Sequence, residues 1–266
     1  MTSSIPWVSR LGQSVLVRRL LLAVGLLVLW HFAVVLLRIP PFLVPSPISV
    51  IQVLWQDLQN GALIAALTNT LRLLLMGVGL GLLGGIFLAT LSILSTWGRD
   101  LLAILVSVFN PLPGVAILPL AMLWFGLTPT AIGFVVTYGA LWPMAISIDT
   151  GFRTVNPILL MLGRNLGLRG PSLVKDVMLP AALPHLLSGL KIAWAFGWRT
   201  IVAAELVFGV AGAQAGIGWY INQARYFLET PRVFSGLVMI ALVGILAETL
   251  FNLIERWTIE RWGMKR

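Results

Sequence analysis

Six long apolar runs, separated by short polar or proline-rich breaks, organise this chain. A helix needs about 20 apolar residues to cross the hydrocarbon core of a bilayer, and each run is close to that length. The runs cover residues 20–37, 71–94, 101–124, 130–148, 183–208 and 233–253. The pattern therefore predicts an all-α integral membrane protein with about six transmembrane helices.

A shorter helical pattern follows the first run. Pro45-Ser46-Pro47 offers Ser46 as an N-cap and Pro47 as the first helical residue. Residues 48–59 then place Val50, Ile51, Leu54 and Leu58 at helical spacing, with polar side chains mostly elsewhere. This segment predicts an amphipathic helix on the membrane surface.

The composition supports lipid as the main solvent. Hydrophobic residues make up 59% of the chain and charged residues only 10%, whereas soluble domains carry about 25% charge. The net charge of +9 is therefore a matter of membrane topology rather than of nucleic-acid binding. The absence of cysteine excludes disulfides, thiolate metal sites and cysteine nucleophiles.

The positions of Lys and Arg predict the orientation. With the N-terminus inside, the inner segments are 1–19, 95–100, 149–181 and 255–266. They hold twelve Lys and Arg, against three (Arg38, Arg225 and Arg232) in the outer segments. Because basic residues gather on the cytoplasmic side, both termini are expected to be cytoplasmic.

We accordingly expect four regions. Residues 1–38 form a cytoplasmic N-terminus and the first transmembrane helix, and 39–70 an outer-side loop with the amphipathic helix. Residues 71–254 form a core of five transmembrane helices that includes a cytoplasmic loop at 149–181. Residues 255–266 form a cytoplasmic tail.

The loop is the most informative segment. Residues 156–184 read as a hydrophobic and cationic helix, a Gly-Leu-Arg-Gly-Pro break at 167–171, and a second helix ending at Leu179-Pro180. It is too short and too polar to span a membrane. Such a helix lies on a surface, either of lipid or of a protein partner.

This segment resembles the conserved cytoplasmic loop of binding-protein-dependent ABC importer permeases, the EAA loop. The glycine of that motif falls on Gly167, and its Ile-x-Leu-Pro close falls on Val177, Leu179 and Pro180. The Glu-Ala-Ala start falls on Met161, Leu162 and Gly163, so this half of the motif has diverged.

Further stretches resemble the nitrate/sulfonate/taurine/bicarbonate group of these permeases. They are LVPSP (43–47), LPLAMLWFGLTPTAIGF (118–134), GIGWYINQAR (216–225), and residues 179–206, 230–248 and 255–264. Together they span about residues 40–264 in family order.

The resemblance implies the type I ABC importer permease fold. Two copies form a pore as a homodimer in the bacterial inner (plasma) membrane, and a small polar, anionic nutrient such as nitrate, a sulfonate, taurine or bicarbonate passes through by alternating access. A cytoplasmic ATPase binds ATP and Mg, and an extracytoplasmic protein delivers the substrate. The implied ATPase-coupling residues are Gly163, Arg164, Gly167, Leu168, Arg169, Gly170, Leu179 and Pro180.

This chain itself is expected to be neither an enzyme nor a cofactor carrier. It has no G-x-x-x-x-G-K-[ST] phosphate loop. His31 and His185 do not form a pair at metal-ligand spacing. Two alternatives are a self-sufficient secondary transporter or channel, which favours more intramembrane charge or an internal repeat, and a membrane-embedded enzyme, which needs a catalytic cluster.

Candidate pathway residues gather in two spans. Asn110, Pro113, Pro119 and Trp124 lie in the proline-rich third span, which is either broken beside a pathway or merely kinked. Arg199 and Glu205 lie in the fifth, too far around the helix to pair directly. Arg199 therefore needs either an anionic substrate or an acid on another helix, such as Glu205 of a second copy.

Gly77, Gly81 and Gly85 form a row at four-residue spacing in the second span. Such rows let helix backbones approach closely. The row is expected to serve packing within one subunit in preference to a contact between two copies.

Overall fold

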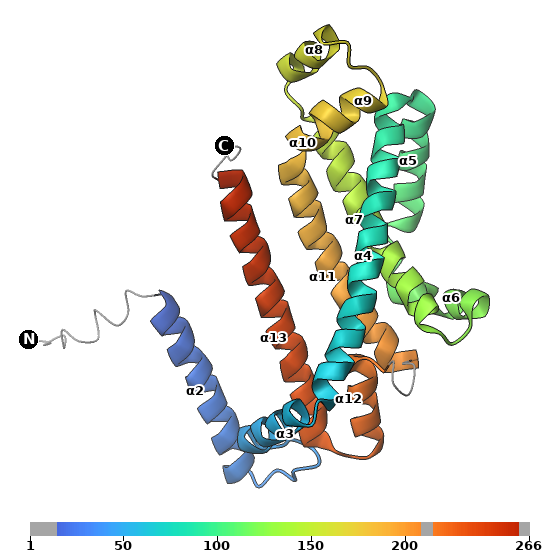
Figure 1. The fold of residues 1–266 in the computed structure, drawn as a ribbon. Coiled ribbons are helices and arrows are strands. Elements are labelled where there is room, and N and C mark those ends of the chain that lie inside the picture. Colours follow the sequence, from blue (N-terminus) through green and yellow to red (C-terminus); the bar gives the residue numbers. More distant parts are fainter. Residues whose placement is uncertain (1–14, 209–214, 261–266) are drawn as a thin grey trace, which may run out of the picture.

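The structure, a computed structural model of the chain, describes residues 15–208 and 215–260. The regular elements in these ranges are all helices, and the longest of them run side by side (Figure 1). The elements are α2 (Val15–Leu36), α3 (Pro47–Gln59), α4 (Ala62–Leu94), α5 (Thr96–Phe109), η1 (Gly114–Ile117), α6 (Leu118–Phe125), α7 (Pro129–Arg153), α8 (Pro157–Asn165), α9 (Pro171–Leu173), η2 (Val174–Met178), α10 (Leu179–Ala181), α11 (Leu183–Phe208), α12 (Ile217–Tyr226), α13 (Thr230–Glu255) and η3 (Arg256–Glu260).

Up to six membrane spans fit the described residues. The helices α2, α4, α7 and α13 are each long and apolar enough to cross a bilayer. Two further spans are bent pairs, α5 with η1 and α6 at 88°, and α9–α10 with α11 at 75°. The prediction of an all-α membrane protein with about six spans is confirmed.

The helix α7 forms the centre of the bundle, with α4 on one side and α11 on another. The glycine row of α4 makes the first contact possible. A Cβ added at Gly81 would lie 2.7 Å from the Cβ of Ala140, and one at Gly85 would lie 2.7 Å from the Cβ of Met144. The row therefore serves packing within one subunit, as predicted.

Several helices extend beyond the predicted apolar runs, and at two of these boundaries the local cause is visible. The helix α4 begins at Ala62 rather than near Leu71, because the hydroxyls of Thr68 and Thr70 donate to backbone carbonyls one turn earlier and so do not interrupt the helix. Of the polar turn predicted at 95–100, only Ser95 is extended, and it caps α5 by accepting a hydrogen bond from Gly98 N at 2.9 Å.

The short helices gather at opposite ends of the bundle. The helices α8, α9 and α10 lie at one end, which we call the hairpin end, and α3 and α12 lie at the other (Figure 1). The predicted N-cap of α3 is confirmed, since Ser46 Oγ accepts from Ser49 N at 3.2 Å. The glycine-rich segment at 209–214 lies outside the described residues.

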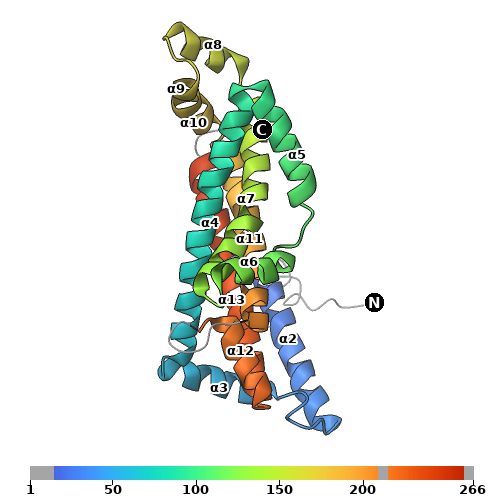
Figure 2. The same cartoon turned by 90° about the vertical axis from the view of Figure 1, so that its right-hand side faces the viewer.

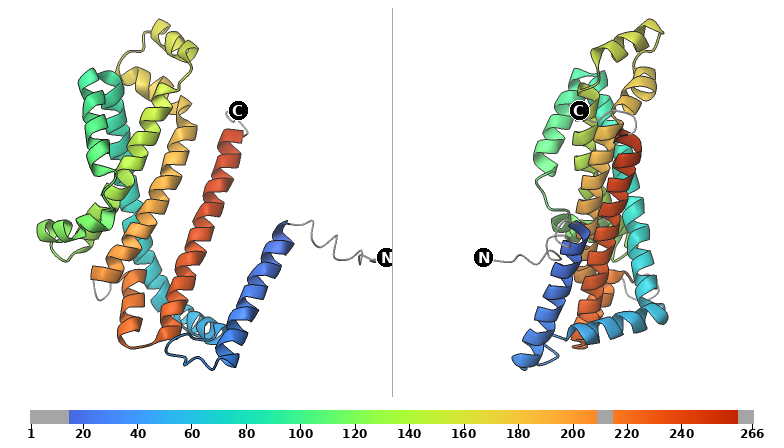
Figure 3. Two further views of the ribbon diagram at one scale, coloured as in Figure 1. Left: turned by 180° about the vertical axis from the view of Figure 1, so that it is seen from behind. Right: turned by 90° about the vertical axis from the view of Figure 1, so that its left-hand side faces the viewer.

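The helix α2 is the least integrated span. Only 6% of the most apolar stretch of this helix is buried within the chain. The helix stands apart from α13 except near α3 (Figure 3). Its contacts include a ring contact of 5.7 Å between Trp30 and Phe234. On another side of the bundle, α6 lies across α7 near mid-height (Figure 2).

Candidate functional site

The α8–α10 hairpin, residues 157–181, is fixed by its own backbone. Gly167 has a φ of +83°, a left-handed conformation that favours glycine. Gly167 N donates to Arg164 O and Leu168 N donates to Gly163 O, both at 3.0 Å. This is the Schellman pattern, which ends a helix and reverses the chain.

The two arms of the hairpin touch at Gly163. A Cβ at this position would lie 2.7 Å from Leu173 Cδ1 and 3.0 Å from Val177 Cγ2. Glycine therefore allows the second arm to cross closely over α8. The second arm continues as a helix through Leu179 and Pro180 to Ala181, one residue beyond the predicted end.

The outer face of α8 is apolar and exposed. Its exposed side chains include those of Ile158, Met161 and Leu162, and Leu166 just after α8 is 82% exposed. The sequence predicted a surface helix at this segment, and Met161 and Leu162 of its exposed face stand where the family motif begins with Glu-Ala-Ala. An apolar helix face at the tip of a protein is typical of a partner-binding surface.

The proline-rich third span is broken. The helix α5 ends with Asn110 as its C-cap, Pro113 precedes η1, and α6 leaves at 88° to α5. The ring of Phe109 stacks on that of Trp142 with centroids 5.5 Å apart, and Tyr138 Oη donates to Phe109 O. These contacts anchor the break to α7, so it is a fixed feature rather than a gentle kink.

The break also reaches α11 close to Arg199. A Cβ at Gly114 would lie 3.0 Å from Thr200 Cγ2, and Thr200 follows Arg199. The Arg199 side chain is exposed and forms no ion pair within the part of the chain that the structure describes. Asn110, Pro113 and Pro119 are exposed as well.

Glu205 has a different position from Arg199. It is 2% exposed, and Thr70 Oγ1 lies 2.9 Å from both of its carboxylate oxygens. Gly218 N donates to Glu205 Oε2 at 2.9 Å, and Ile217 N donates to Thr70 Oγ1 at 2.8 Å. Glu205 and Thr70 thus cap the N-terminus of α12 from two other helices. Because the Glu205 carboxylate is buried and already hydrogen-bonded, it is not available to pair with Arg199 of a second copy.

A second buried acid lies nearby. Asp57 of α3 accepts from Tyr220 Oη at 2.6 Å, from Arg232 Nε at 2.9 Å and from Asn60 Nδ2 at 3.0 Å. Burial raises the pKa of the Asp57 carboxyl, but the hydrogen bonds from Tyr220, Arg232 and Asn60 outweigh it and hold the pKa below its usual value. The ion pair with Arg232 joins α3 to α13, and the hydrogen bond from Tyr220 joins α3 to α12.

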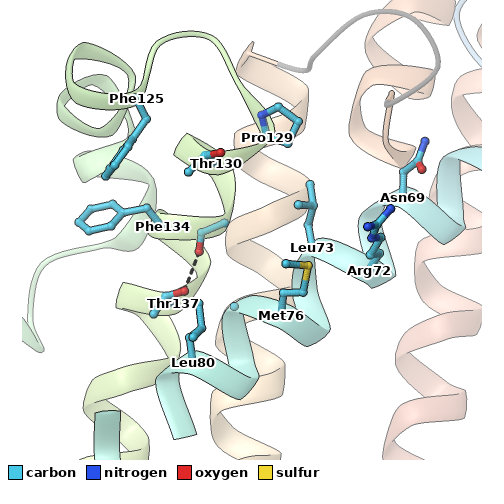
Figure 4. Close-up of a pocket in the computed structure, with 12 residues that line it drawn as sticks. Asn69, Arg72, Leu73, Met76, Leu80, Phe125, Pro129, Thr130, Phe134 and Thr137 are labelled. Atoms are coloured by element: carbon cyan, nitrogen blue, oxygen red, sulfur yellow. Dashed lines mark hydrogen bonds between the residues drawn. The ribbon is translucent and has the colours of Figure 1, made fainter. Parts of the chain in front are cut away.

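A cavity of about 630 Å³ opens between α4 and the α6–α7 corner. Arg72 lies toward one end of it, and Met76, Leu80 and Phe134 line the rest (Figure 4). The ring of Trp124 packs edge-on against Phe134 at 5.8 Å. The structure therefore brings one predicted pathway residue, Trp124, beside a cavity whose cation, Arg72, the sequence alone did not assign to a pathway.

Comparison with known proteins defines the class. A family model described as "Binding-protein-dependent transport system inner membrane component" matches residues 81–260. The chain belongs to this family and is an ABC importer permease, a multi-pass membrane subunit that works with a separate ATPase chain and a binding protein.

The chain is also similar to individual curated permeases over most of their length. It is 33% identical over 242 residues to the putative aliphatic sulfonates transport permease SsuC of Escherichia coli (strain K12), covering 91% of this chain and 90% of that one. It is 30% identical to the taurine transport system permease TauC of the same organism (90% and 89%). It is 31% identical to the riboflavin transport system permease RibX of Chloroflexus aurantiacus (89% and 87%).

Solved structures share the fold. The MetNI methionine ABC transporter in an inward-facing conformation matches with a TM-score of 0.61 at 20% identity, over 73% of this chain and 94% of that one. An amino acid ABC transporter matches with a TM-score of 0.59 at 22% identity, over 76% and 97%. The expected type I importer permease fold is confirmed.

Proposed function

We propose that this permease imports a small organic anion of the sulfonate class by alternating access. The exposed apolar face of α8, held on a hairpin that its own backbone fixes, is the observation that carries the proposal. A rigid apolar protrusion gives a cytoplasmic ATPase a surface to hold and to move. ATP and Mg are bound in that partner, and this chain contributes the pore.

The substrate class is supported by two kinds of observation. The relatives described above include permeases for aliphatic sulfonates and for taurine, which is itself a sulfonate. Arg72 and Arg199 are exposed cations within apolar helices, and cations in such positions mark paths for anions. In this proposal two copies enclose the path, a binding protein delivers the anion at the α12 end, and both termini are cytoplasmic.

Reconstitution tests the proposal. The permease, its ATPase and the cognate binding protein are placed in liposomes, and ATP-dependent uptake of taurine and of hexanesulfonate is measured. Uptake that requires all three proteins is expected. Uptake by the permease alone, without ATP, would instead establish a secondary transporter or channel.

The orientation has its own test. Because the chain has no cysteine, a single cysteine can be placed at Asn165 on the hairpin or at Gln223 on α12 and labelled in intact cells with a membrane-impermeant maleimide. Labelling at 223 only is expected. Labelling at 165 would place the hairpin outside, where no ATPase could bind it.

A further inference from the structure

A second large cavity, of about 690 Å³, lies between the hairpin and the ends of α4 and α7. Three guanidinium groups line it, those of Arg153, Arg164 and Arg169. None of the described residues that line it is acidic. Its apolar lining includes Leu94 at the end of α4 and Leu173 on the second arm of the hairpin.

The charges around the cavity do not balance. Asp149 accepts two hydrogen bonds from Arg153, at 2.8 and 3.1 Å, and Arg153 also donates to Ser92 Oγ at 2.9 Å. Arg164 and Arg169 form no ion pair with an acid in the ranges 15–208 and 215–260. Two of the three cations therefore have no paired carboxylate among the described residues, and the cavity carries a positive surplus.

The backbone holds two of these cations in place. Arg164 lies in the last turn of α8, which the Schellman pattern ends. Arg169 N donates to Ser172 Oγ at 3.1 Å, and Ser172 Oγ donates to Arg169 O at 2.8 Å. The backbone positions of both residues are thus fixed before any ligand binds, which lowers the entropy cost of binding.

The cavity lies at the level of lipid headgroups. Leu94 is the last residue of α4, and Trp97, three residues later, is 86% exposed. Exposed tryptophans of membrane proteins gather at the boundary between hydrocarbon and headgroups. The end of α4, and with it the floor of the cavity, therefore lies at this boundary.

We propose that the cavity binds the headgroup of an anionic phospholipid from the cytoplasmic leaflet. Guanidinium groups bind phosphate oxygens in bidentate pairs, and basic pockets between helices on this side of a membrane suit anionic headgroups. The apolar lining receives the upper part of the acyl chains. The lipid would join the hairpin to α4 and α7, the joint through which the ATPase moves the spans.

The cavity and the apolar face of α8 are distinct surfaces. Leu160 and Arg164, one turn apart, face the cavity, whereas Leu162 is two positions from Leu160 and faces away. An ATPase on the outer face of α8 therefore leaves the cavity free for lipid. In this proposal Arg164 and Arg169, which the family resemblance assigns to ATPase coupling, act on that coupling through the lipid. The binding step stands without the proposed function, whereas its effect on ATPase coupling rests on that function.

Binding is tested on the purified full-length permease in bilayers. The variant L94C, in a chain with no other cysteine, carries a fluorophore at the cavity floor, and its quenching by brominated phosphatidylglycerol is compared with quenching by brominated phosphatidylcholine. Preferential quenching by phosphatidylglycerol is expected. Equal quenching by the two lipids would overturn the proposal, whatever the charge variants described below show.

Localisation is tested by removing charge. Arg164→Gln with Arg169→Gln, in the L94C background, should lower the preference for phosphatidylglycerol roughly 25-fold, about fivefold for each charge. Arg99→Gln is the matched control, because Arg99 is an exposed arginine on the neighbouring helix α5 outside the cavity. An equal effect of the control and the double variant, or no effect of either, would contradict the assignment.

The last test uses the transporter assembled with its ATPase. Adding the ATPase to the L94C permease should leave the phosphatidylglycerol preference unchanged, and ATP hydrolysis stimulated by the binding protein should be higher in phosphatidylglycerol than in phosphatidylcholine alone. Loss of the preference on adding ATPase would show that acidic side chains of the ATPase fill the cavity. Failure of the ATPase to bind would refute the proposed function and leave the lipid measurement intact.

Discussion

The two ends of this permease are held together by opposite means. At the hairpin end, the bonds that fix the chain reversal at Gly167 are backbone bonds between residues three and five positions apart. At the α12 end, the bonds join side chains far apart in sequence, with separations of 135 residues for Thr70–Glu205 and 175 for Asp57–Arg232.

The two ends therefore have different mechanical roles. The hairpin keeps its shape by itself and leaves an apolar face free, so a partner can move it as a rigid piece. The α12 end exists only when α3, α4, α11, α12 and α13 are already in place, so it follows the spans as they move. Changes at the α12 end should therefore reduce stability, and changes in the hairpin should reduce coupling.

The largest effect on stability is expected from Glu205→Leu. The change leaves Gly218 N without its buried acceptor, while the Thr70 hydroxyl keeps only the Ala66 carbonyl, and we expect a loss of roughly 2–3 kcal/mol in the free energy of unfolding. Denaturant unfolding in detergent micelles measures it. Glu205→Gln keeps an acceptor for Gly218 N and should lose clearly less; an equal loss in both variants would contradict the capping role.

Gly167→Val is expected to lower the free energy of unfolding less than Glu205→Leu does, but to impair binding of the ATPase more. A β-branched residue at a φ of +83° costs about 1–2 kcal/mol, and relief of that strain distorts the hairpin. We expect co-purification of the ATPase to be lost while the permease still inserts. Gly167→Asn, which tolerates left-handed backbone, should restore binding, and full coupling in the valine variant would refute the rigid hairpin.

Asp57→Asn tests the α12 end through the pH dependence of its stability. The folded pKa of Asp57 is lowered, so its ionised form contributes stability above the unfolded pKa of about 4. That contribution is lost as pH falls through the folded pKa. We expect the variant to be about 1 kcal/mol less stable at pH 7 and to lack this part of the acid-induced loss, measured as unfolding midpoints from pH 7 to pH 3. Identical pH profiles would contradict the assignment.

The smallest effect on stability is expected from Leu162→Ser on the exposed face of α8. A surface change of this kind should alter the free energy of unfolding by less than about 0.5 kcal/mol. ATPase binding, measured by titration of the reconstituted permease, should nevertheless weaken severalfold, because apolar area leaves the interface. Asn165→Ser, at an exposed polar position of the same helix, is the control and should leave binding unchanged.

Much of the fold was predictable because local chemistry decided it. Apolar runs of bilayer length predicted the spans, and the fifth run matches α11 at Leu183–Phe208. Ser46 was identifiable as an N-cap from its place before Pro47. Gly167 was identifiable as the turn of the loop, since a reversal after a helix commonly needs a left-handed residue.

The remaining features depended on the tertiary structure. The partners of Glu205 could not be read from the chain, because Thr70 and Gly218 reach it only when α4 and α12 pack on α11. The cavity beside Arg72 and the arginine-lined cavity under the hairpin likewise form between elements far apart in sequence. Membrane thickness and local backbone preference act along the chain and are visible in it, whereas buried polar groups take whichever partners the assembled helices bring within reach.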